Sequence, residues 1–404
     1  MSRRNALICL AVILAFSAAV RLVGLGWWPA YVFDEHYYAH DANTLLTRGL
    51  SSPGWRNGGF RQQSHPLLGQ ELIAVGIAAA GNDPWGWRLA SAICGTVLVA
   101  LIYPLARRML LDRFWATIAA ALVACDTLLV VQSRVAMLDG FVALWTVLAV
   151  YGALRAARAR RHAVWWLAAC GAALGLAVAC KWSGALAIPA ALAVLVSWGR
   201  KENRRPPALV VALVVLPLAV YLLTYLPYFL AGHGLSDWVH LQAHMARHGW
   251  SLHHSDVRSA VPAGWLSDSN PIWYEWQLTP GGLRALVAIG NPWIWWGGAV
   301  AVVLLAVAAV RKRSRVLALP VLLVLCLYLP WLATSRTAFL YYMAPIVPFL
   351  ALALARALSL LRSQLAPLLA APAVVPLAVW LPFLISVSVP YGYYEAVMVL
   401  PAWR

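Results

Sequence analysis

Two adjacent acidic residues, Asp34 and Glu35, are the first side chains in the sequence with a candidate chemical role. They follow an apolar segment and lie among the aromatic residues Trp28, Tyr31 and Phe33. Apolar surroundings disfavour the charged form of a carboxylate and therefore raise its basicity. Such a carboxylate can act as a general base on a weak nucleophile such as a hydroxyl group. The alternative is a structural pair bonded to Tyr or Arg neighbours.

Three basic residues, Arg88, Arg134 and Lys181, each fall at or just inside the same end of a predicted membrane span. A cation at membrane depth is costly, so it usually has a partner or a function. The function that these residue types suggest is phosphate binding, because the planar fork of Arg holds phosphate oxygens at two points. Asp126 and Asp139 lie at similar depth, and structural ion pairs with them are the alternative.

Several histidines are candidate ligands. His240, His244 and His248 are spaced four residues apart, which places them on one face of a helix and could form a metal site. We favour a solvated helix face, predict no metal site and expect no cofactor to be required, although a divalent metal is not excluded. His65 precedes Pro66 in another segment and could donate a hydrogen bond to a phosphate or a sugar.

The elements that must position these residues are membrane helices. The chain has 404 residues, of which 63% are hydrophobic and only 11% are charged, whereas soluble domains have about 45–50% apolar and about 25% charged residues. A spanning helix needs about 20 predominantly apolar residues. Runs of this kind predict eleven spans, near residues 5–26, 84–106, 114–132, 138–155, 163–180, 182–198, 207–231, 290–310, 316–333, 339–360 and 365–389.

The net charge is +17, and the positions of the charged residues fit a chain that crosses a membrane several times. If the N-terminus is inside, most basic residues fall on the inner side, whereas only Asp112 and Glu202 of the fourteen acids do. Basic residues mark cytoplasmic loops, so this pattern predicts a multi-pass protein of the plasma membrane with a cytoplasmic N-terminus. It also argues against nucleic acid as a partner. The two long segments, 27–83 and 232–289, then lie outside, and the chemistry is expected at the extracytoplasmic face.

Two further alternatives concern the first predicted span and the inner loops. The first span could be a cleaved signal peptide, but its apolar stretch continues to Gly26, which favours an uncleaved helix. The inner loops are short and contain no G-x-x-x-x-G-K-[ST] motif. We therefore expect no ATP-binding module.

Several motifs occur in an order that resembles the protein O-mannosyltransferase family, which belongs to the C class of membrane glycosyltransferases. The resemblance extends over nearly the whole chain. Its motifs are Phe33-Asp34-Glu35 with Tyr37-Tyr38, Ser64-His65-Pro66-Leu67-Leu68-Gly69-Gln70, Trp87-Arg88-Leu89-Ala90, Ser133-Arg134 to Asp139, Lys181-Trp182-Ser183-Gly184, Gly290-Asn291-Pro292-Trp293 and Tyr341-Tyr342-Met343-Ala344-Pro345.

The resemblance implies an all-α membrane fold of about eleven spans, with residues 1–404 forming one glycosyltransferase domain. It implies transfer of mannose from polyprenyl-phosphate mannose to Ser or Thr hydroxyls of a secreted or membrane protein, with inversion at the sugar. The implied catalytic residues are Asp34, as the base, and Glu35. The implied donor-binding residues are His65, Arg88, Arg134, Asp139 and Lys181.

The motif around His65 departs from the family pattern. Leu67 replaces a Pro and Gln70 replaces a Lys, so the donor sugar is less firmly predicted than the reaction class. The alternatives are transfer of a sugar to a lipid or glycan, as in the related aminoarabinose transferase, and a transporter or lipid flippase. A membrane anchor for a partner would leave Asp34, Arg88, Arg134 and Lys181 without a function.

Overall fold

The structure is a computed structural model of the chain, and it describes residues 1–50, 64–199, 206–251, 261–268, 270–334, 337–361 and 364–404. The segment 200–205, which holds four basic residues and Glu202 and falls on the predicted inner side, lies outside the described residues. The helices of the first half are α1 (Arg3–Leu22), α2 (Glu35–Arg48), α3 (Leu68–Ala80), α4 (Pro84–Arg108), α5 (Arg113–Ala124), α6 (Thr127–Gln132), α7 (Asp139–Arg158), α8 (Ala163–Cys180) and α9 (Ala187–Trp198).

The second half combines further helices with one β-hairpin. Its elements are α10 (Pro206–Val210), α11 (Leu216–Thr224), α12 (Leu226–Leu230), α13 (Leu235–Ser251), β1 (Ile272–Thr279), β2 (Gly282–Ala288), α14 (Pro292–Arg311), α15 (Arg315–Leu332), α16 (Val347–Leu358), α17 (Val374–Ile385) and α18 (Tyr391–Val397). Short 3₁₀ segments occur at Trp182–Leu186 and Leu340–Met343, and a π-helical turn at Val211–Val215 joins α10 to α11.

Polar residues begin several of the apolar helices. The side chain of Asp83 accepts hydrogen bonds from the first backbone N–H groups of α4, as do Asp112 for α5, Asp126 for α6 and Asn291 for α14. These N–H groups have no partner within their own helix, and an Asp or Asn side chain is well suited to accept from them. The caps therefore fix where each helix starts.

Eight helical segments in the described part of the chain are long and apolar enough to cross a membrane. They include α1, α4, α7, α8, α14 and α15, and each corresponds to a predicted span. The other three predicted spans correspond to the shorter helices α5, α9 and α16, each of which continues into a second short helical segment. The helical membrane fold is thus confirmed, while the count of eleven stays a prediction.

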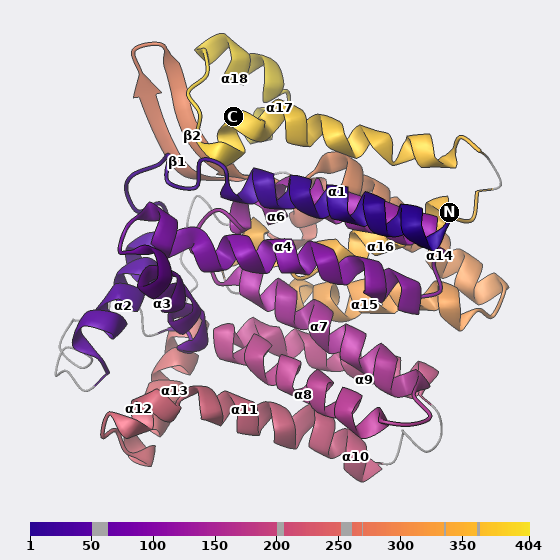
Figure 1. The fold of residues 1–404 in the computed structure, drawn as a ribbon, viewed down its shortest axis with the longest axis horizontal. Coiled ribbons are helices and arrows are strands. Elements are labelled where there is room, and N and C mark those ends of the chain that lie inside the picture. The colour runs from indigo at the N-terminus through magenta and orange to yellow at the C-terminus, as the bar shows by residue number, and fades with distance from the viewer. Residues whose placement is uncertain (51–63, 200–205, 252–260, 269, 335–336, 362–363) are drawn as a thin grey trace.

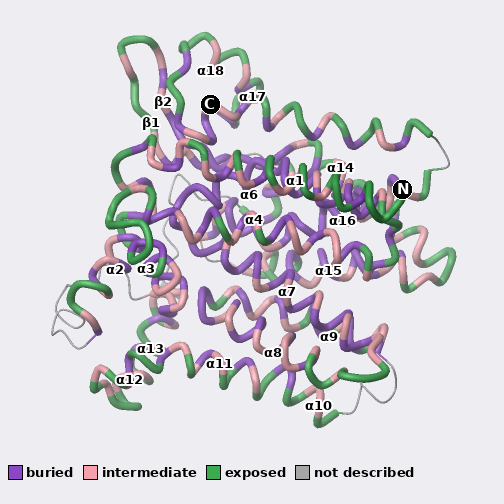
Figure 2. The backbone as a smooth tube through the Cα atoms, viewed as in Figure 1, coloured by how far each residue is buried: buried purple, intermediate pink, exposed green. Residues whose placement is uncertain are grey.

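The centre and the outward faces of the helix bundle differ in burial. The centre of the bundle is buried, whereas the outward faces of helices such as α1, α11 and α17 are exposed (Figure 2). The exposed side chains on these faces are apolar, for example Val12, Leu223 and Val375. Apolar exposure of this extent is expected where lipid replaces water as the solvent.

The long helices run side by side, and several shorter elements gather at one end of them (Figure 1). In this view, α2, α3, α12 and α13 lie at the left end, and the hairpin with α18 lies above them. α4 starts near this end at Pro84 and finishes at the other with Arg107 and Arg108. The elements of segments 27–83 and 232–289 therefore share one end of the bundle.

The hairpin is a departure from a purely helical fold. β1 and β2 pair antiparallel across a turn at Pro280-Gly281. They pack against the C-terminal region in a small core of their own, with Leu283, Trp380 and Phe383 among its buried members. This hairpin was not predicted, although the alternating apolar residues around Pro-Gly-Gly are a hairpin signal.

Candidate active site

A cavity of about 760 Å³ is lined by residues from α2, α13 and β1, which all lie towards the same end of the bundle. It is lined by three of the predicted site residues, Asp34, His65 and Lys181. Aromatic and polar side chains complete the wall, among them Tyr38, Trp182, His248, Tyr274, Glu275, Trp331, Tyr341 and Tyr342. The remaining predicted residues, Glu35, Arg88, Arg134 and Asp139, are not part of this wall.

A tight turn before α2 separates the two adjacent acids. Phe33 has a φ of 47°, in the left-handed region that bulky residues rarely adopt. The N–H of Glu35 donates to the carbonyl of Val32 at 2.9 Å and closes the turn. As a result the side chain of Asp34 lines the cavity while that of Glu35 is fully buried. Strained backbone of this kind is often found at functional sites.

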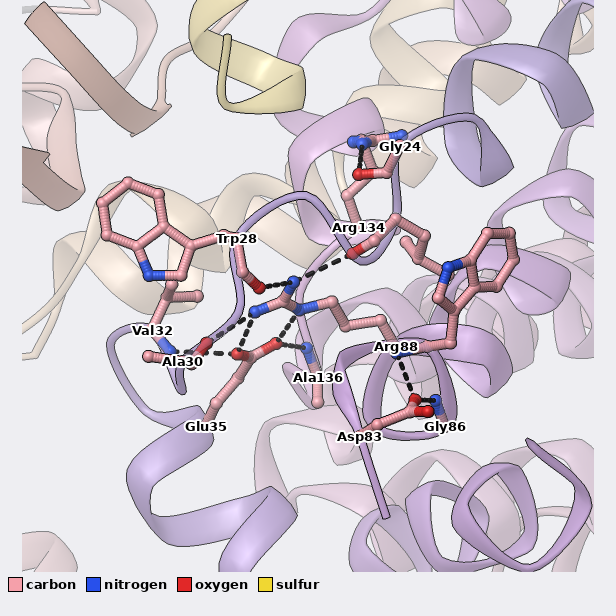
Figure 3. A network of polar contacts seen from close by, with 12 residues as sticks. Gly24, Trp28, Ala30, Val32, Glu35, Asp83, Gly86, Arg88, Arg134 and Ala136 are labelled. Carbon is pink, nitrogen blue, oxygen red and sulfur yellow. Dashed lines mark hydrogen bonds and ion pairs between the residues drawn. The ribbon is translucent and has the colours of Figure 1, made fainter. Parts of the chain in front are cut away.

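Glu35 and Arg88 form a buried ion pair (Figure 3). Nε and Nη2 of Arg88 each donate to a carboxylate oxygen of Glu35 at 2.8 Å. Nη1 donates to the carbonyls of Leu25 and Trp28 at 2.9 Å, and Nη2 also donates to that of Ala30 at 3.0 Å. All five N–H groups of this guanidinium are therefore directed at the protein itself.

The carboxylate of Glu35 is equally saturated. Besides its bonds to Arg88, it accepts from the backbone N–H groups of Val32 and Ala136, both at 2.9 Å (Figure 3). Ala136 belongs to the segment before α7, so this one side chain joins the first loop, α4 and that segment. Through these contacts Glu35 has a structural role, because it holds the turn at Asp34 in place.

Arg134 binds the end of the first helix. Its Nη1 and Nη2 groups donate to the carbonyls of Val20, Val23 and Gly24 at 2.7 to 3.0 Å, and its Nε donates to that of Leu384 at 3.0 Å. A cation at a helix C-terminus is favourable because the last carbonyls carry partial negative charge. The structure thus directs Arg134, like Arg88, at backbone oxygens of the segment that precedes Asp34.

Lys181 and Asp139 form the second buried ion pair of the region. Nζ of Lys181 lies 3.0 and 2.9 Å from the two carboxylate oxygens of Asp139. The same ammonium lies 4.2 Å from the ring centre of Tyr342 and 5.3 Å from that of Tyr341. Lys181 reaches the cavity wall and Asp139 does not, so the cation is the member of the pair that a bound anion can approach.

Tyrosines surround Asp34 on the cavity wall. Phe33 stacks on Tyr274 with ring centres 4.6 Å apart and meets Tyr341 edge-on at 5.9 Å. Burial raises the pKa of Tyr38 well above its ordinary value, and the charge of Asp34 acts in the same direction. Burial likewise raises the pKa of Tyr274. Both hydroxyls therefore stay protonated at neutral pH and can donate hydrogen bonds. Neither residue was among the predicted site residues.

The histidine row divides between solvent and cavity. His240 and His244 are exposed on α13, whereas His248 lines the cavity. Across the described ranges no group of three or more His, Cys, Asp or Glu side chains is arranged to hold a metal ion. His65 also lines the cavity, with its ring centre 6.1 Å from that of Tyr38.

The whole fold is shared with solved membrane glycosyltransferases. It matches the Saccharomyces cerevisiae protein O-mannosyltransferase Pmt1-Pmt2 complex with a TM-score of 0.87, at 14% identity, over 100% of this chain and 93% of that chain. It matches ArnT from Cupriavidus metallidurans with a TM-score of 0.63, at 20% identity, over 92% and 64% of the two chains. The molecule is therefore a membrane protein with the fold of the C-class glycosyltransferases.

Sequence relatives identify the family within this class. The model of the dolichyl-phosphate-mannose-protein mannosyltransferase family matches residues 81–231. A polyprenol-phosphate-mannose–protein mannosyltransferase of Mycobacterium tuberculosis is 30% identical, over 79% of this chain and 74% of that relative. Its counterpart in Corynebacterium glutamicum is 27% identical, over 98% and 93%. The chain belongs to the polyprenol-phosphate-mannose–protein mannosyltransferase family.

Proposed function

We propose that this protein transfers mannose from polyprenyl-phosphate mannose to Ser or Thr hydroxyls of a secreted or membrane protein. The observation that carries the proposal is that the carboxylate of Asp34 and the buried ammonium of Lys181 line the same cavity, together with tyrosine side chains. A base for the acceptor and a cation for a phosphate are the two charges that this reaction needs.

Asp34 is the proposed base. The acceptor hydroxyl gives its proton to the Asp34 carboxylate while its oxygen attacks the anomeric carbon of the mannose. The bond from that carbon to the phosphate oxygen breaks, and polyprenyl phosphate leaves with the electron pair. Attack from the face opposite the leaving group inverts the configuration. The second acid, Glu35, has the role of a positioning residue, because its four acceptor contacts are already made.

Lys181 is the proposed partner of the leaving phosphate. Fixed donors aimed at developing negative charge contribute most when water is excluded, and Lys181 is almost fully buried on the cavity wall. His65 lines the same cavity and is a further donor. Asp139 orients the ammonium through its two short contacts.

Arg88 and Arg134 receive a different role from the one that the sequence suggested. Phosphate binding was expected of both, but their guanidinium N–H groups donate to Glu35 and to backbone carbonyls. We therefore assign the phosphate to Lys181 and His65 and give the two arginines the task of holding the Asp34 segment.

A small space of about 10 Å³ adjoins the main cavity and marks a direction in which the lipid chain of the donor could leave it. Ser183, Trp331 and Tyr342 line both spaces, and the second is otherwise bordered by Thr146 and by apolar side chains such as Leu186 and Leu327. An isoprenoid chain that leaves Lys181 in this direction would pass between the helices that carry those leucines, α15 and the 3₁₀ segment before α9.

The orientation in the membrane belongs to the same proposal. α4, α7 and α14 begin towards the cavity end and finish with Arg108, Arg158 and Arg311. Basic residues at the far ends agree with a cytoplasmic N-terminus and an extracytoplasmic active site. The protein would then act on acceptors outside the cytoplasm.

The deciding experiment uses the purified protein in lipid nanodiscs with polyprenyl-phosphate mannose, labelled in the sugar, and a peptide rich in Ser and Thr. Label should enter the peptide with the wild-type protein, and Asp34→Asn should lower the rate about 10²–10⁴-fold without lowering Tm. Label in a lipid or glycan fraction instead would support the aminoarabinose-transferase type of reaction. Full transfer by the Asn variant would overturn the assignment of the base.

A further inference from the structure

The hydrogen bonds of the hairpin reveal an open strand edge beside the cavity. Leu283 of β2 exchanges both of its backbone hydrogen bonds with Val389, at 2.8 and 2.9 Å, on the side away from β1. In the β1–β2 register, Leu283 lies opposite Leu278. Because Leu283 has used its N–H and C=O elsewhere, this cross-strand pair is one of those without hydrogen bonds.

The backbone of Leu278 therefore points away from β2. Residues along an antiparallel strand alternate between the two orientations, so Trp276, opposite Ala285, faces outward as well. In the part of the chain that the structure describes, the N–H and C=O of Leu278 make no backbone hydrogen bond outside the hairpin, and Leu278 is 69% exposed. The N–H of Trp276 donates to the carboxylate of Glu275.

The same strand enters the cavity at its other end. A β-bulge interrupts the register between Trp273 and Glu275, and Tyr274 and Glu275 both line the cavity that holds Asp34. Bulges end strand pairing and redirect side chains next to active sites. At about 3.3 Å per residue, Leu278 lies about 10 Å along the strand from Glu275.

We propose that the acceptor polypeptide binds in extended form as an added strand on the outer edge of β1 at Trp276–Leu278, which delivers its Ser or Thr to Asp34. This inference rests on the proposed function, since it needs a protein acceptor. The Leu278 N–H and C=O and the Trp276 C=O supply main-chain bonds, and the acceptor leaves the ladder at the bulge and enters the cavity past Glu275.

The chemistry of this edge defines the kind of acceptor. Main-chain hydrogen bonds give affinity without a sequence requirement, and side chains on alternate positions adjust it. The exposed ring of Trp276 lies 5.1 Å from Tyr394, which lies 5.4 Å from the exposed Tyr391. This aromatic surface suits apolar or proline side chains of an unfolded segment. The protein is thus expected to glycosylate extended rather than helical or folded segments.

The first test leaves the enzyme unaltered. Acceptor peptides are N-methylated at one backbone position at a time, and the KM for each is measured with the labelled donor in nanodiscs. Each lost N–H···O bond should raise KM about 2- to 10-fold, and the effect should recur at every second residue on one side of the acceptor Ser or Thr. An effect that is uniform, or absent at all positions, would overturn the added strand.

The second test alters the edge. Leu278→Pro removes an outward N–H at a place where an edge strand tolerates proline, and Leu278→Ala is the matched control. The Pro variant should have an acceptor KM several-fold above that of the Ala variant, with the same KM for the donor. Equal kinetics of the two variants would contradict the inference. If the Pro variant is not recovered folded, the N-methyl series decides.

The two proposals fail in different ways. Wild-type protein that transfers no mannose to any peptide would refute the proposed function, and the inference would fall with it. Transfer to peptides without the alternating N-methyl pattern would refute the inference alone and leave the proposed function intact.

Discussion

The adjacent acids provide a sharp test of the site, because Glu35→Gln and Asp34→Asn should have opposite effects. Glutamine has nearly the same shape as glutamate, but one of its two terminal atoms is a donor. The Glu35 carboxylate accepts four hydrogen bonds, two on each oxygen, and each oxygen has one bond from Arg88 and one from the backbone. Whichever way the amide is turned, two of these donors lose their acceptor.

The magnitude follows from burial. Glu35 and Arg88 are at most 2% exposed, so solvent cannot replace the lost partner. Breaking a buried ion pair by removing one charge typically costs about 3–5 kcal/mol. We expect Glu35→Gln to lower the stability of the protein by about this amount, whereas Asp34→Asn, on the cavity wall, should leave stability close to wild type.

The assay is thermal unfolding in the same detergent for both variants, followed by transfer activity at a temperature where each is folded. A cycle with Arg88→Gln and the double variant should show a coupling of about 0.5–3 kcal/mol. Glu35→Gln with the wild-type Tm and no transfer would refute the assignment, because it would make Glu35 the chemical residue.

Three other perturbations follow from the geometry. Replacing both members of the second ion pair, Lys181→Met with Asp139→Asn, should keep the fold but raise the KM for the lipid-phosphate donor about tenfold or more. The reason is that a hydrogen bond to a charged group contributes about 1.5–3 kcal/mol. An unchanged donor KM would exclude Lys181 as the phosphate partner. Burial raises the pKa of Asp268 in the folded protein well above its ordinary value. Between the ordinary pKa of the unfolded chain and this raised pKa, the folded state keeps a proton that the unfolded state releases. The stability of the protein therefore falls as the pH rises from the unfolded pKa to the folded pKa. Asp268→Asn should therefore raise Tm at pH 7 and have little effect near pH 3, and equal shifts at both would contradict this account. A Cβ at Gly95 would lie 1.9 Å from Oγ of Ser133, so Gly95→Ala should destabilise by about 1–3 kcal/mol, which a Tm equal to wild type would disprove.

The spans were predictable because lipid imposes length and polarity on them. Composition and hydrophobic runs located α1, α4, α7, α8, α14 and α15 without any knowledge of their packing. The hairpin was missed even though Pro280-Gly281 stands between alternating segments. The dominance of helices in the composition obscured a short element whose only signal is local turn chemistry.

The candidate site was predictable in its residue types but not in their tasks. Arg88 and Arg134 carry charge at membrane depth, which marks them as important. Their partners include backbone carbonyls of residues such as Leu25 and Val20. Every residue type has a backbone carbonyl, so the sequence does not indicate which carbonyls an arginine will bind. Asp34 and Glu35 are neighbours in the chain, yet Asp34 lines the cavity and Glu35 is buried. The orientation of the turn and of α2 decides which is which, and it depends on packing that the residue types do not give.

The two arginines also affect how the protein can be made. The chain is synthesised from its N-terminus, so the carbonyls between Val20 and Ala30 are inserted long before their partners. Arg88 follows Glu35 by 53 residues, and Arg134 follows Gly24 by 110. Until α4 and the segment before α7 have entered the membrane, the hydrogen bonds by which Arg88 and Arg134 hold the segment before Asp34 cannot form. The ribosome-bound intermediate is therefore expected to be inactive, and truncated chains that end before Arg134 should neither mature nor transfer sugar.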